Sequence, residues 1–354
     1  GGVLQTEYAF FTNDKGDHSN GAYIRNAKLS ASGVIDYDWF YLIENNFVGN
    51  KSKLSAAFVS YNGFEPLSIS FGQFNERFGF ENNASSKYTT FLEPAFVSVF
   101  APSNRIGVAL NTHAKNWTGN IGLNATSSAQ SSKDSKSDKL TTISSRVTYT
   151  PIMNEDRLIH FGISGIYGKP KDDNYEYRIT AAPESKKAIS LVDSGKIMDV
   201  ENIKIMGFES MIQQNALSLQ AEYAFNNIKR KTSRDIKHKT WYAQVAYTLT
   251  GEARIYDEEE GVLGNINPKN PFNLRTGGTG AWEVGLRYNH INLGEDKFIG
   301  TIGSKLDSLS FALNWYPNDY TSFMANYIIA DQKDEISNDK NNPNILMFRA
   351  QFAF

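Results

Sequence analysis

Apolar and polar residues alternate with a period of two along almost the whole chain, and this pattern limits the possible folds most strongly. Residues 117–125, 217–226, 241–250 and 282–289 each carry apolar side chains at every second position, mostly with polar residues between them. Successive side chains of a strand point to opposite faces, so the pattern indicates strands with one apolar face. Because helical periodicity is nearly absent, we predict an all-β fold.

Three features favour strands that cross a membrane over the strands of a soluble sandwich, which also alternate. The segments are about ten residues long, as tilted strands that span a bilayer must be. Aromatic residues such as Trp241, Trp282 and Trp315 stand at segment ends, where a membrane interface would lie, and the chain holds 23 Phe, 18 Tyr and 5 Trp. Short connections also alternate with longer polar ones, as in outer-membrane barrels.

These features predict a transmembrane antiparallel β-barrel of 16 strands that forms a single domain over residues 1–354. An even strand number and closure leave no exposed sheet edge. The chain ends on Phe354 after an alternating strand, which is typical of proteins of the bacterial outer membrane, and we expect the protein there. The predicted strands are 2–11, 22–33, 37–48, 54–61, 66–74, 104–111, 115–126, 141–150, 158–168, 203–213, 216–226, 239–250, 280–290, 305–316, 321–330 and 345–354.

Composition disfavours several other classes of protein. The chain has 36 Lys and Arg against 38 Asp and Glu, which disfavours a nucleic-acid-binding protein. It has no Cys, which excludes disulfide scaffolds, zinc–cysteine sites and thiol nucleophiles. No run of about 18 apolar residues is present that would form a transmembrane helix. A strand pattern rather than a signal peptide begins at Gly1, so we expect a mature or trimmed chain.

The sequence indicates neither a catalytic site nor a metal site. The five His are scattered, and no two of them have the spacing of metal ligands. His160 and Ser164 share one face of a predicted strand, but that face is expected to line the lumen, where polar residues are common. We therefore expect no enzyme activity, no metal and no cofactor.

Along a strand of a membrane barrel, the set of alternate positions that holds the apolar residues faces lipid, and the positions between them face the lumen. We call the first set the apolar parity. This rule places Glu7, Glu222 and Glu283 in the lumen together with several basic residues, so the predicted lumen carries both signs of charge. Arg25 falls on the apolar parity, which leaves open whether it faces a subunit interface or lies in a distorted stretch. The basic residues that we expect to line the pore or bind anions are Arg25, Lys28, Arg77, Lys87, Arg105, Arg146, Arg287 and Arg349.

Residues 75–103 form a connection that is too apolar to extend into water, because it contains five Phe among other apolar residues. The barrel lumen is the available place for these side chains to be buried. We therefore expect this third extracellular loop to fold into the lumen and narrow the pore. That arrangement brings Arg77, Glu81, Lys87 and Glu93 into the constriction.

Three further connections, 127–140, 169–202 and 227–239, are predicted to be extracellular loops. The last of them carries many basic residues against Asp235 alone. If this loop lies over the outer mouth, it focuses anions there. A solvated loop, or one bound to the phosphates of lipopolysaccharide, is an equal alternative. The basic residues are Lys229, Arg230, Lys231, Arg234, Lys237 and Lys239.

Several groups of residues, taken together, carry a resemblance to a known family. They are Tyr23–Leu29, Tyr61–Pro66, Phe71–Phe74, Phe78-Gly79 with Ser85–Lys87, Tyr242–Glu252, Gly280–Glu283 with Arg287-Tyr288, and Asn314–Tyr316. With these groups the chain resembles the phosphate-selective porin family of types O and P. The resemblance runs from Gly1 to Phe354.

The resemblance implies a trimeric, 16-stranded outer-membrane channel for anions with its third loop folded into the pore. It also implies a row of arginines that leads to a narrow zone lined by lysine. Lys87, in a Ser-Ser-Lys motif, matches this pattern. In contrast, Val3, Asn26 and Asn82 stand where the family has basic residues, and 169–202 is mixed in sign rather than rich in arginine.

We therefore expect a passive diffusion porin for small hydrophilic solutes with a weak preference for anions. Its expected partners are outer-membrane lipid, lipopolysaccharide and two further copies of the chain in a homotrimer. Two alternatives remain open. One is a channel selective for phosphate or organic anions, served by Lys28, Lys87, Arg105 and Arg146. The other is a surface-exposed structural or adhesion barrel with a plugged lumen.

Overall fold

The computed structural model describes residues 1–12, 18–49, 53–102, 104–127, 140–154, 157–172, 175–294, 305–333 and 341–354. Sixteen antiparallel strands form one closed barrel, in which strands adjacent along the chain are paired and β1 also pairs with β20. Each observed strand overlaps one predicted strand, so the predicted 16-stranded transmembrane antiparallel barrel is confirmed. The strands are β1 (Gly2–Thr12), β2 (Gly21–Ile35), β3 (Trp39–Asn46), β4 (Lys53–Phe64), β5 (Leu67–Phe74), β6 (Arg105–Ala114), β7 (Trp117–Ser127), β8 (Leu140–Met153), β9 (Arg157–Pro170), β12 (Val200–Gln214), β13 (Leu217–Arg230), β14 (Ile236–Thr248), β17 (Ala281–Asn292), β18 (Lys305–Asn318), β19 (Thr321–Lys333) and β20 (Asn344–Ala353).

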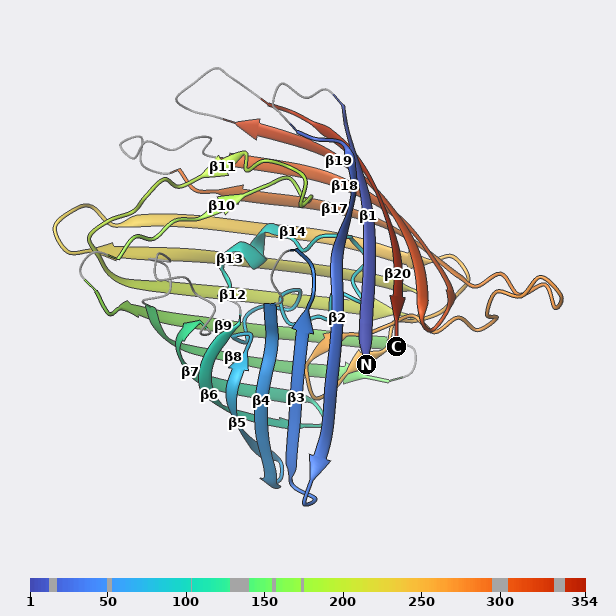
Figure 1. The fold of residues 1–354 in the computed structure, drawn as a ribbon, viewed down its shortest axis with the longest axis horizontal. Coiled ribbons are helices and arrows are strands. Elements are labelled where there is room, and N and C mark those ends of the chain that lie inside the picture. The colour runs from blue at the N-terminus through green and yellow to red at the C-terminus, as the bar shows by residue number, and fades with distance from the viewer. Residues whose placement is uncertain are drawn as a thin grey trace.

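The two ends of the barrel differ in their connections (Figure 1). Both chain termini and the tight turn between β2 and β3 lie at one end, which we call the short-turn end. The connections from β9 to β12 and from β13 to β14 lie at the opposite, long-loop end. Gly2 and Phe354 exchange two backbone hydrogen bonds, of 2.7 and 3.0 Å, which join the two termini at the short-turn end. Among the residues described, no helix is long and apolar enough to span a membrane.

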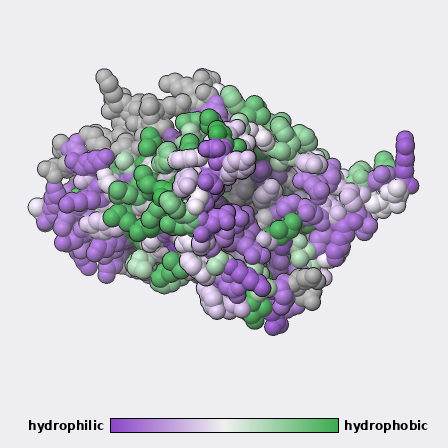
Figure 2. Space-filling view, turned by 90° about the horizontal axis from the view of Figure 1, so that it is seen from below, coloured by the Kyte–Doolittle hydropathy of each residue, from purple (hydrophilic) through white to green (hydrophobic). Residues whose placement is uncertain are grey.

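Side chains alternate between the outer surface and the lumen. On β1, Tyr8 and Phe10 are exposed on the outer surface, whereas Gln5 and Glu7 are buried inside the barrel. On the molecular face drawn in Figure 2, hydrophobic patches lie between two hydrophilic ends, and hydrophilic residues also occupy part of the middle. An apolar outer band between polar ends is what the hydrocarbon core of a membrane requires.

Aromatic side chains gather on the outer surface near the short-turn end. Trp39, Trp117 and Trp282 lie at the starts of β3, β7 and β17, and Trp315 lies near the end of β18. The ring of Trp315 stacks between Trp282 and Phe323, with centroid distances of 5.6 and 5.5 Å. Rings in this position anchor a barrel at the membrane–water interface.

Parts of three connections fold back into the lumen. The constriction loop (residues 75–102) contains the 3₁₀ helix η1 (Phe96–Phe100), and the outer insertion (residues 175–199) contains β10 (Thr180–Ala181) and β11 (Val192–Asp193). Both enter from the long-loop end. The inner insertion (residues 252–266) enters from the short-turn end and contains the hairpin of β15 (Tyr256–Asp257) and β16 (Val262–Leu263).

An apolar core inside the lumen holds the constriction loop and the outer insertion together. Phe78, Phe96 and Phe100 of the constriction loop pack in one cluster with Ile179 and Val192 of the outer insertion. Full burial of such a side chain stabilises the fold by about 1.5–3 kcal/mol. The core fills the lumen against β9, β12–β14 and β17–β19, so the open space lies along the opposite wall. The strand residues that complete it include Ile166, Ile203, Ile205, Ile228, Ile236, Ile291, Leu306 and Ala330.

The structure corrects the predicted bounds of two outer loops. Strands β9 and β12 extend into both ends of the predicted loop 169–202, and much of the remainder is the outer insertion within the lumen. The predicted loop 227–239 consists mostly of strand, and only 231–235 form its turn. Basic and polar residues such as Lys229 and Lys237 occupy the outward face of the β13–β14 strand ends, so the apolar outward face that marks a membrane-spanning strand is missing there. Of the predicted loop 127–140, residues 128–139 lie outside the described part of the chain.

Candidate transport pathway

Four of the arginines predicted to face the lumen are each paired with a carboxylate. All four are buried, so their charges are compensated within the protein. Removal of one partner of a buried ion pair costs about 3–5 kcal/mol, because the other charge loses its compensation. The pairs are Arg105–Glu76 (3.0 Å), Arg146–Glu209 (2.6 Å), Arg287–Glu81 (3.0 Å) and Arg349–Glu7 (2.7 Å).

Arg287 on β17 fastens two inserted segments to the wall. Its guanidinium donates to the carboxylate of Glu81 in the constriction loop and to that of Glu184 in the outer insertion. The guanidinium carbon also lies 4.2 Å from the centroid of the Phe91 ring, within the range of a cation–π contact. Ser310 on β18 donates to the Glu184 carboxylate at 3.0 Å. The barrel wall thus sets the position of both segments.

Arg349 and Arg105 hold other parts of the constriction loop. Arg349 on β20 donates to the backbone carbonyl of Leu92 as well as to its carboxylate partner. Arg105 on β6 directly follows the loop, pairs with Glu76 at its start and donates to the carbonyl of Ala125 at 3.0 Å. These two arginines therefore hold the constriction loop in its position within the lumen.

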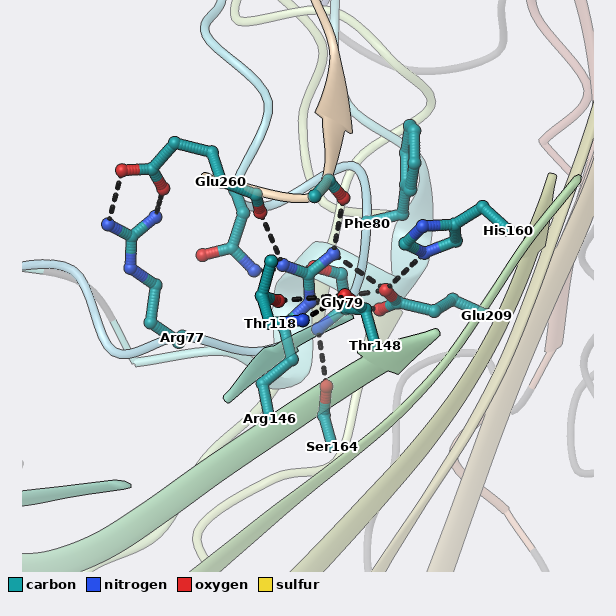
Figure 3. A network of polar contacts seen from close by, with 12 residues as sticks. Arg77, Gly79, Phe80, Thr118, Arg146, Thr148, His160, Ser164, Glu209 and Glu260 are labelled. Carbon is teal, nitrogen blue, oxygen red and sulfur yellow. Dashed lines mark hydrogen bonds and ion pairs between the residues drawn. The ribbon is translucent and has the colours of Figure 1, made fainter. Parts of the chain in front are cut away.

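Arg146 on β8 connects the wall to the inner insertion (Figure 3). Its Nη2 lies 2.6 Å from Oε1 of Glu209 on β12 and donates to the carbonyl of Gly261 at 2.8 Å. Its Nη1 donates to the carbonyl of Glu260 at 2.7 Å. Nε2 of His160 lies 2.9 Å from the same Glu209 oxygen, so this histidine is engaged in the same network.

Polar side chains of the wall also bind the backbone of the constriction loop. The N–H of Gly79 donates to Oγ of Ser164 at 3.0 Å. The N–H groups of Phe80 and Glu81 each donate to the carboxylate of Glu222 at 2.8 Å. Two strands, β9 and β13, therefore fix one short stretch of backbone on the side of the lumen opposite the open space.

Arg25 lies at an irregularity in β2 that explains its unusual parity. Adjacent residues of β1 pair with Ile24 and Asn26 and leave Arg25 as the extra residue of a β-bulge. Its side chain therefore points into the lumen, where Nη2 lies 3.0 Å from a carboxylate oxygen of Glu93 in the constriction loop. Of the two alternatives left open by the sequence, the distorted stretch is the one found.

Three other predicted basic residues lie nearer to open space. Lys28 pairs with Glu44 at 2.8 Å, and about a quarter of each side chain is exposed. Arg77 pairs with Glu260 of the inner insertion, with side-chain exposures of 33% and 39%. Lys87 lines a separate cavity of about 230 Å³ near the short-turn end, and no carboxylate among the described residues forms an ion pair with it.

Two cavities lined by residues that the structure describes lie in the lumen along the wall of β2–β8. The outer cavity, of about 640 Å³, reaches Asn46 and Lys53 near the long-loop end. The inner cavity, of about 750 Å³, reaches Pro66 and His113 near the short-turn end. Each is large compared with the ~30 Å³ that a water molecule occupies in the liquid. The two adjoin, because both are lined by Phe58, Ser70, Arg77, Asn111, Asn120 and Glu260.

The two cavities differ in the balance of the charged residues that line them. Among the residues that the structure describes, five basic and four acidic ones line the outer cavity, whereas two Arg and three Glu line the inner cavity. Burial raises the pKa of Glu76, in the outer cavity, to about 7, although Thr142 and Arg105 partly offset the rise. The charged residues of the outer cavity are Arg25, Lys28, Lys53, Arg77, Lys186, Glu44, Glu76, Glu81 and Glu260.

The predicted basic loop is the end of a strand hairpin, and its strand lysines point away from the lumen. Ile228 and Ile236 are buried inside, so their neighbours on β13 and β14 face outward, on the same face as Trp241. This corrects the interpretation of a loop that lies over the mouth. Arg230 donates to the carbonyl of Met198, and Lys231 and Arg234 lie at the exposed turn. We call Lys204, Lys229, Lys237 and Lys239 the outward basic cluster.

Glu260, Arg254 and Glu184, which connect inserted segments to the wall or to one another, are among the residues that were not predicted from the sequence. Glu260 and Arg254 belong to the connection 251–279, whose length at the short-turn end was the available signal. Arg254 is buried and pairs with Glu283 at 2.8 Å. Glu184 lies in the loop 169–202, which was predicted to be extracellular. The apolar residues around Glu184 were the available signal that this part of the loop is buried. The partners of these three residues are distant along the chain, so sequence spacing did not reveal the contacts.

Comparisons with known proteins agree with this geometry. The model of the family described as "Phosphate-selective porin O and P" matches residues 1–354. Porin O of Pseudomonas aeruginosa is 27% identical over 97% of this chain and 84% of its own length. An anion-selective porin from Comamonas acidovorans has a similar structure, with a TM-score of 0.61 and 12% identity over 100% of this chain and 98% of its own. The trimer form of OmpT from Vibrio cholerae has a TM-score of 0.56 and 11% identity over 99% and 97%. These structural similarities show the barrel fold.

Proposed function

Because this chain belongs to the phosphate-selective porin O and P family, we propose that it passes small hydrophilic solutes with a weak preference for anions. The protein is a passive channel of the bacterial outer membrane. The observation that carries the proposal is the pair of adjoining cavities along β2–β8. They provide a polar route from the long-loop end toward the short-turn end.

The weak anion preference rests on the charges that solutes meet. Lys28, Arg25 and Arg77 line the outer cavity, where the described basic residues exceed the described acidic ones by one. Charges in a water-filled pore act on passing ions through a high dielectric, so a small excess gives a small preference. Lys87 lines the separate cavity near the short-turn end rather than these two, so it adds nothing to this balance.

Strong selectivity for phosphate or organic anions requires several cations that are free to bind the solute. Here Arg105, Arg146, Arg287 and Arg349 are buried in ion pairs, which supports the weakly selective channel over that alternative. The cavity volumes support a channel over an adhesion barrel with a plugged lumen. One experiment, described next, distinguishes both alternatives from the proposal.

The test is single-channel recording of the purified protein in planar lipid bilayers under a KCl gradient. The proposal expects ohmic steps and a reversal potential displaced modestly toward that of chloride. It also expects no block of chloride current by sub-millimolar phosphate. Block at that concentration establishes the selective channel instead, and a folded protein that gives no steps establishes the plugged barrel.

We also propose a homotrimer in which lipopolysaccharide binds the outward basic cluster. The trimeric form of the similar Vibrio cholerae protein supports the assembly. The lysines of the cluster lie toward the long-loop end on the lipid-facing side, above the aromatic Trp241. Lysines at that depth suit the phosphate groups of a lipid headgroup better than they suit solutes in the pore.

A further inference from the structure

The junction between the two cavities is a ring of six residues. Phe58, Ser70, Asn111 and Asn120 come from four consecutive strands of the wall, β4 to β7. Opposite them stand Arg77 of the constriction loop and Glu260 of the inner insertion. A solute that passes from one cavity to the other must cross this ring. Of these six described residues, Arg77 and Glu260 are the ionisable ones.

Arg77 and Glu260 form a two-bond ion pair at this junction (Figure 3). Nη2 of Arg77 lies 2.8 Å from Oε1 of Glu260, and Nη1 bonds the other carboxylate oxygen. Two parallel bonds of this kind join the planar guanidinium group to both oxygens of the carboxylate. About one third of each side chain is exposed, unlike the buried pairs that fasten the inserted segments. The pair therefore faces the route of the solute.

The backbone on both sides of the pair is held in place. The N–H of Glu260 donates to the carboxylate of Asp257 at 2.9 Å, and Arg146 binds the carbonyls of Glu260 and Gly261. Gly261 has φ +63°, a left-handed conformation that favours glycine and closes this turn. On the other side, the residues that follow Arg77 are bound by Ser164 and Glu222. The junction is thus preorganised.

We propose that the Arg77–Glu260 pair sets the ionic selectivity of the channel, by keeping the junction between the cavities electrically neutral. In this arrangement Glu260 compensates the cation that the constriction loop brings to the junction between the two cavities. Small inorganic and organic anions then meet no net positive charge there. This inference rests on the proposed function as a diffusion channel and deepens it. It explains how a channel with many arginines has only a weak anion preference.

Removal of either partner leaves one uncompensated charge at the junction. Two unit charges 4 Å apart in water interact strongly enough to change an equilibrium by about fivefold. Glu260→Gln keeps the size and hydrogen-bonding capacity of the side chain, and it should raise the chloride-to-potassium permeability ratio about threefold to fivefold. Arg77→Gln should lower the ratio by a similar factor. The double variant R77Q/E260Q restores neutrality and should return close to the wild-type ratio.

The experiment measures reversal potentials of the four proteins, wild type, E260Q, R77Q and the double variant, in bilayers under a KCl gradient. Glu201→Gln is the matched control, because Glu201 pairs with Lys229 at 3.1 Å on the exposed surface outside both cavities. It should leave the ratio unchanged. Before recording, the gel mobility of each variant is compared with and without heating, because a folded barrel changes its mobility when heat unfolds it.

Opposite shifts in the single variants with recovery in the double variant support the inference. The inference is overturned if the folded single variants have permeability ratios that differ from the wild-type ratio by less than about a fifth of its value. It is also overturned if the ratio of the double variant is no closer to wild type than the ratios of the single variants. A wild-type barrel that conducts no ions contradicts the proposed function instead. The two failures are therefore distinguishable in one set of recordings.

Discussion

Arg146 on β8 and Glu209 on β12 form a buried ion pair, with side-chain exposures of 3% and 1%. Nη2 and Nε of the arginine lie 2.6 and 3.1 Å from the same carboxylate oxygen. The guanidinium also binds two carbonyls of the inner insertion, at Glu260 and Gly261. The Arg146 side chain therefore both stabilises the pairing of charges on the barrel wall and positions the inner insertion, which borders both cavities.

Arg146→Met should lower the free energy of unfolding by about 3–5 kcal/mol, because Glu209 stays buried without its guanidinium partner. The measurement is urea-induced unfolding of the barrel in lipid or detergent, followed by tryptophan fluorescence. Arg157→Met is the control, since Arg157 is exposed and bonds Gln214 at 2.9 Å. It should cost less than about 1 kcal/mol. Equal losses in the two variants contradict a special role of the buried pair.

Glu184→Ala should release the outer insertion from the wall. Glu184 accepts hydrogen bonds from Arg287 on β17 and from Ser308 and Ser310 on β18, and the variant loses all of them at once. We expect faster limited proteolysis within 175–199 and a larger single-channel conductance, because the segment fills part of the lumen.

The control for this prediction is Glu176→Ala in the same insertion. Glu176 pairs at 3.6 Å with Lys196, whose side chain is 64% exposed, and such pairs contribute little. Proteolysis and conductance should stay near wild type. If both glutamate variants open the channel equally, the insertion is held by its apolar core rather than by the contacts of Glu184.

Strand positions were predictable from the sequence because lipid and water on opposite faces impose alternation directly. The same parity correctly placed Arg287 and Glu283 on the lumen side. It failed at Arg25, because a one-residue bulge reverses the parity without changing composition. The same parity also decides which way Tyr316 faces. Its outward neighbour is Trp315, so the tyrosine faces inward and donates to Glu283 at 2.9 Å.

The pairing of charges inside the lumen was not predictable from the sequence. Arg287 and Glu81 are separated by 206 positions, and nothing in local spacing relates them. The inward fold of 75–103 was expected from its apolar composition, but the matching entry of the inner insertion from the other end was not. The contact of Arg77 with Glu260 requires both segments, so it emerges only from the three-dimensional arrangement.

The anion preference should increase as the pH falls from about 8 to 6. Burial raises the pKa of Glu76 to about 7 from an ordinary value of 4.5, so this carboxyl is charged above that range and neutral below it. Protonation removes one negative charge from the lining of the outer cavity, which favours anions. Reversal potentials at several pH values measure the effect. Glu76→Gln should show the low-pH preference at every pH, and an unchanged pH step in that variant assigns the titration to another group.

Lys229→Gln combined with Lys237→Gln should weaken the binding of lipopolysaccharide about tenfold or more, because each lysine near an anionic surface contributes about 1 kcal/mol. Both side chains lie on the outward face of the β13–β14 hairpin, so the double variant should leave the reversal potential unchanged. Binding is measured by titration of the purified barrel with lipopolysaccharide at two salt concentrations, since screening weakens exposed charges. Lys28→Gln, in the lumen, is the control and should show the reverse pattern, with normal lipopolysaccharide binding and an altered reversal potential. A shift of the reversal potential in the double variant without a loss of lipopolysaccharide binding would instead place this basic group over the mouth of the pore.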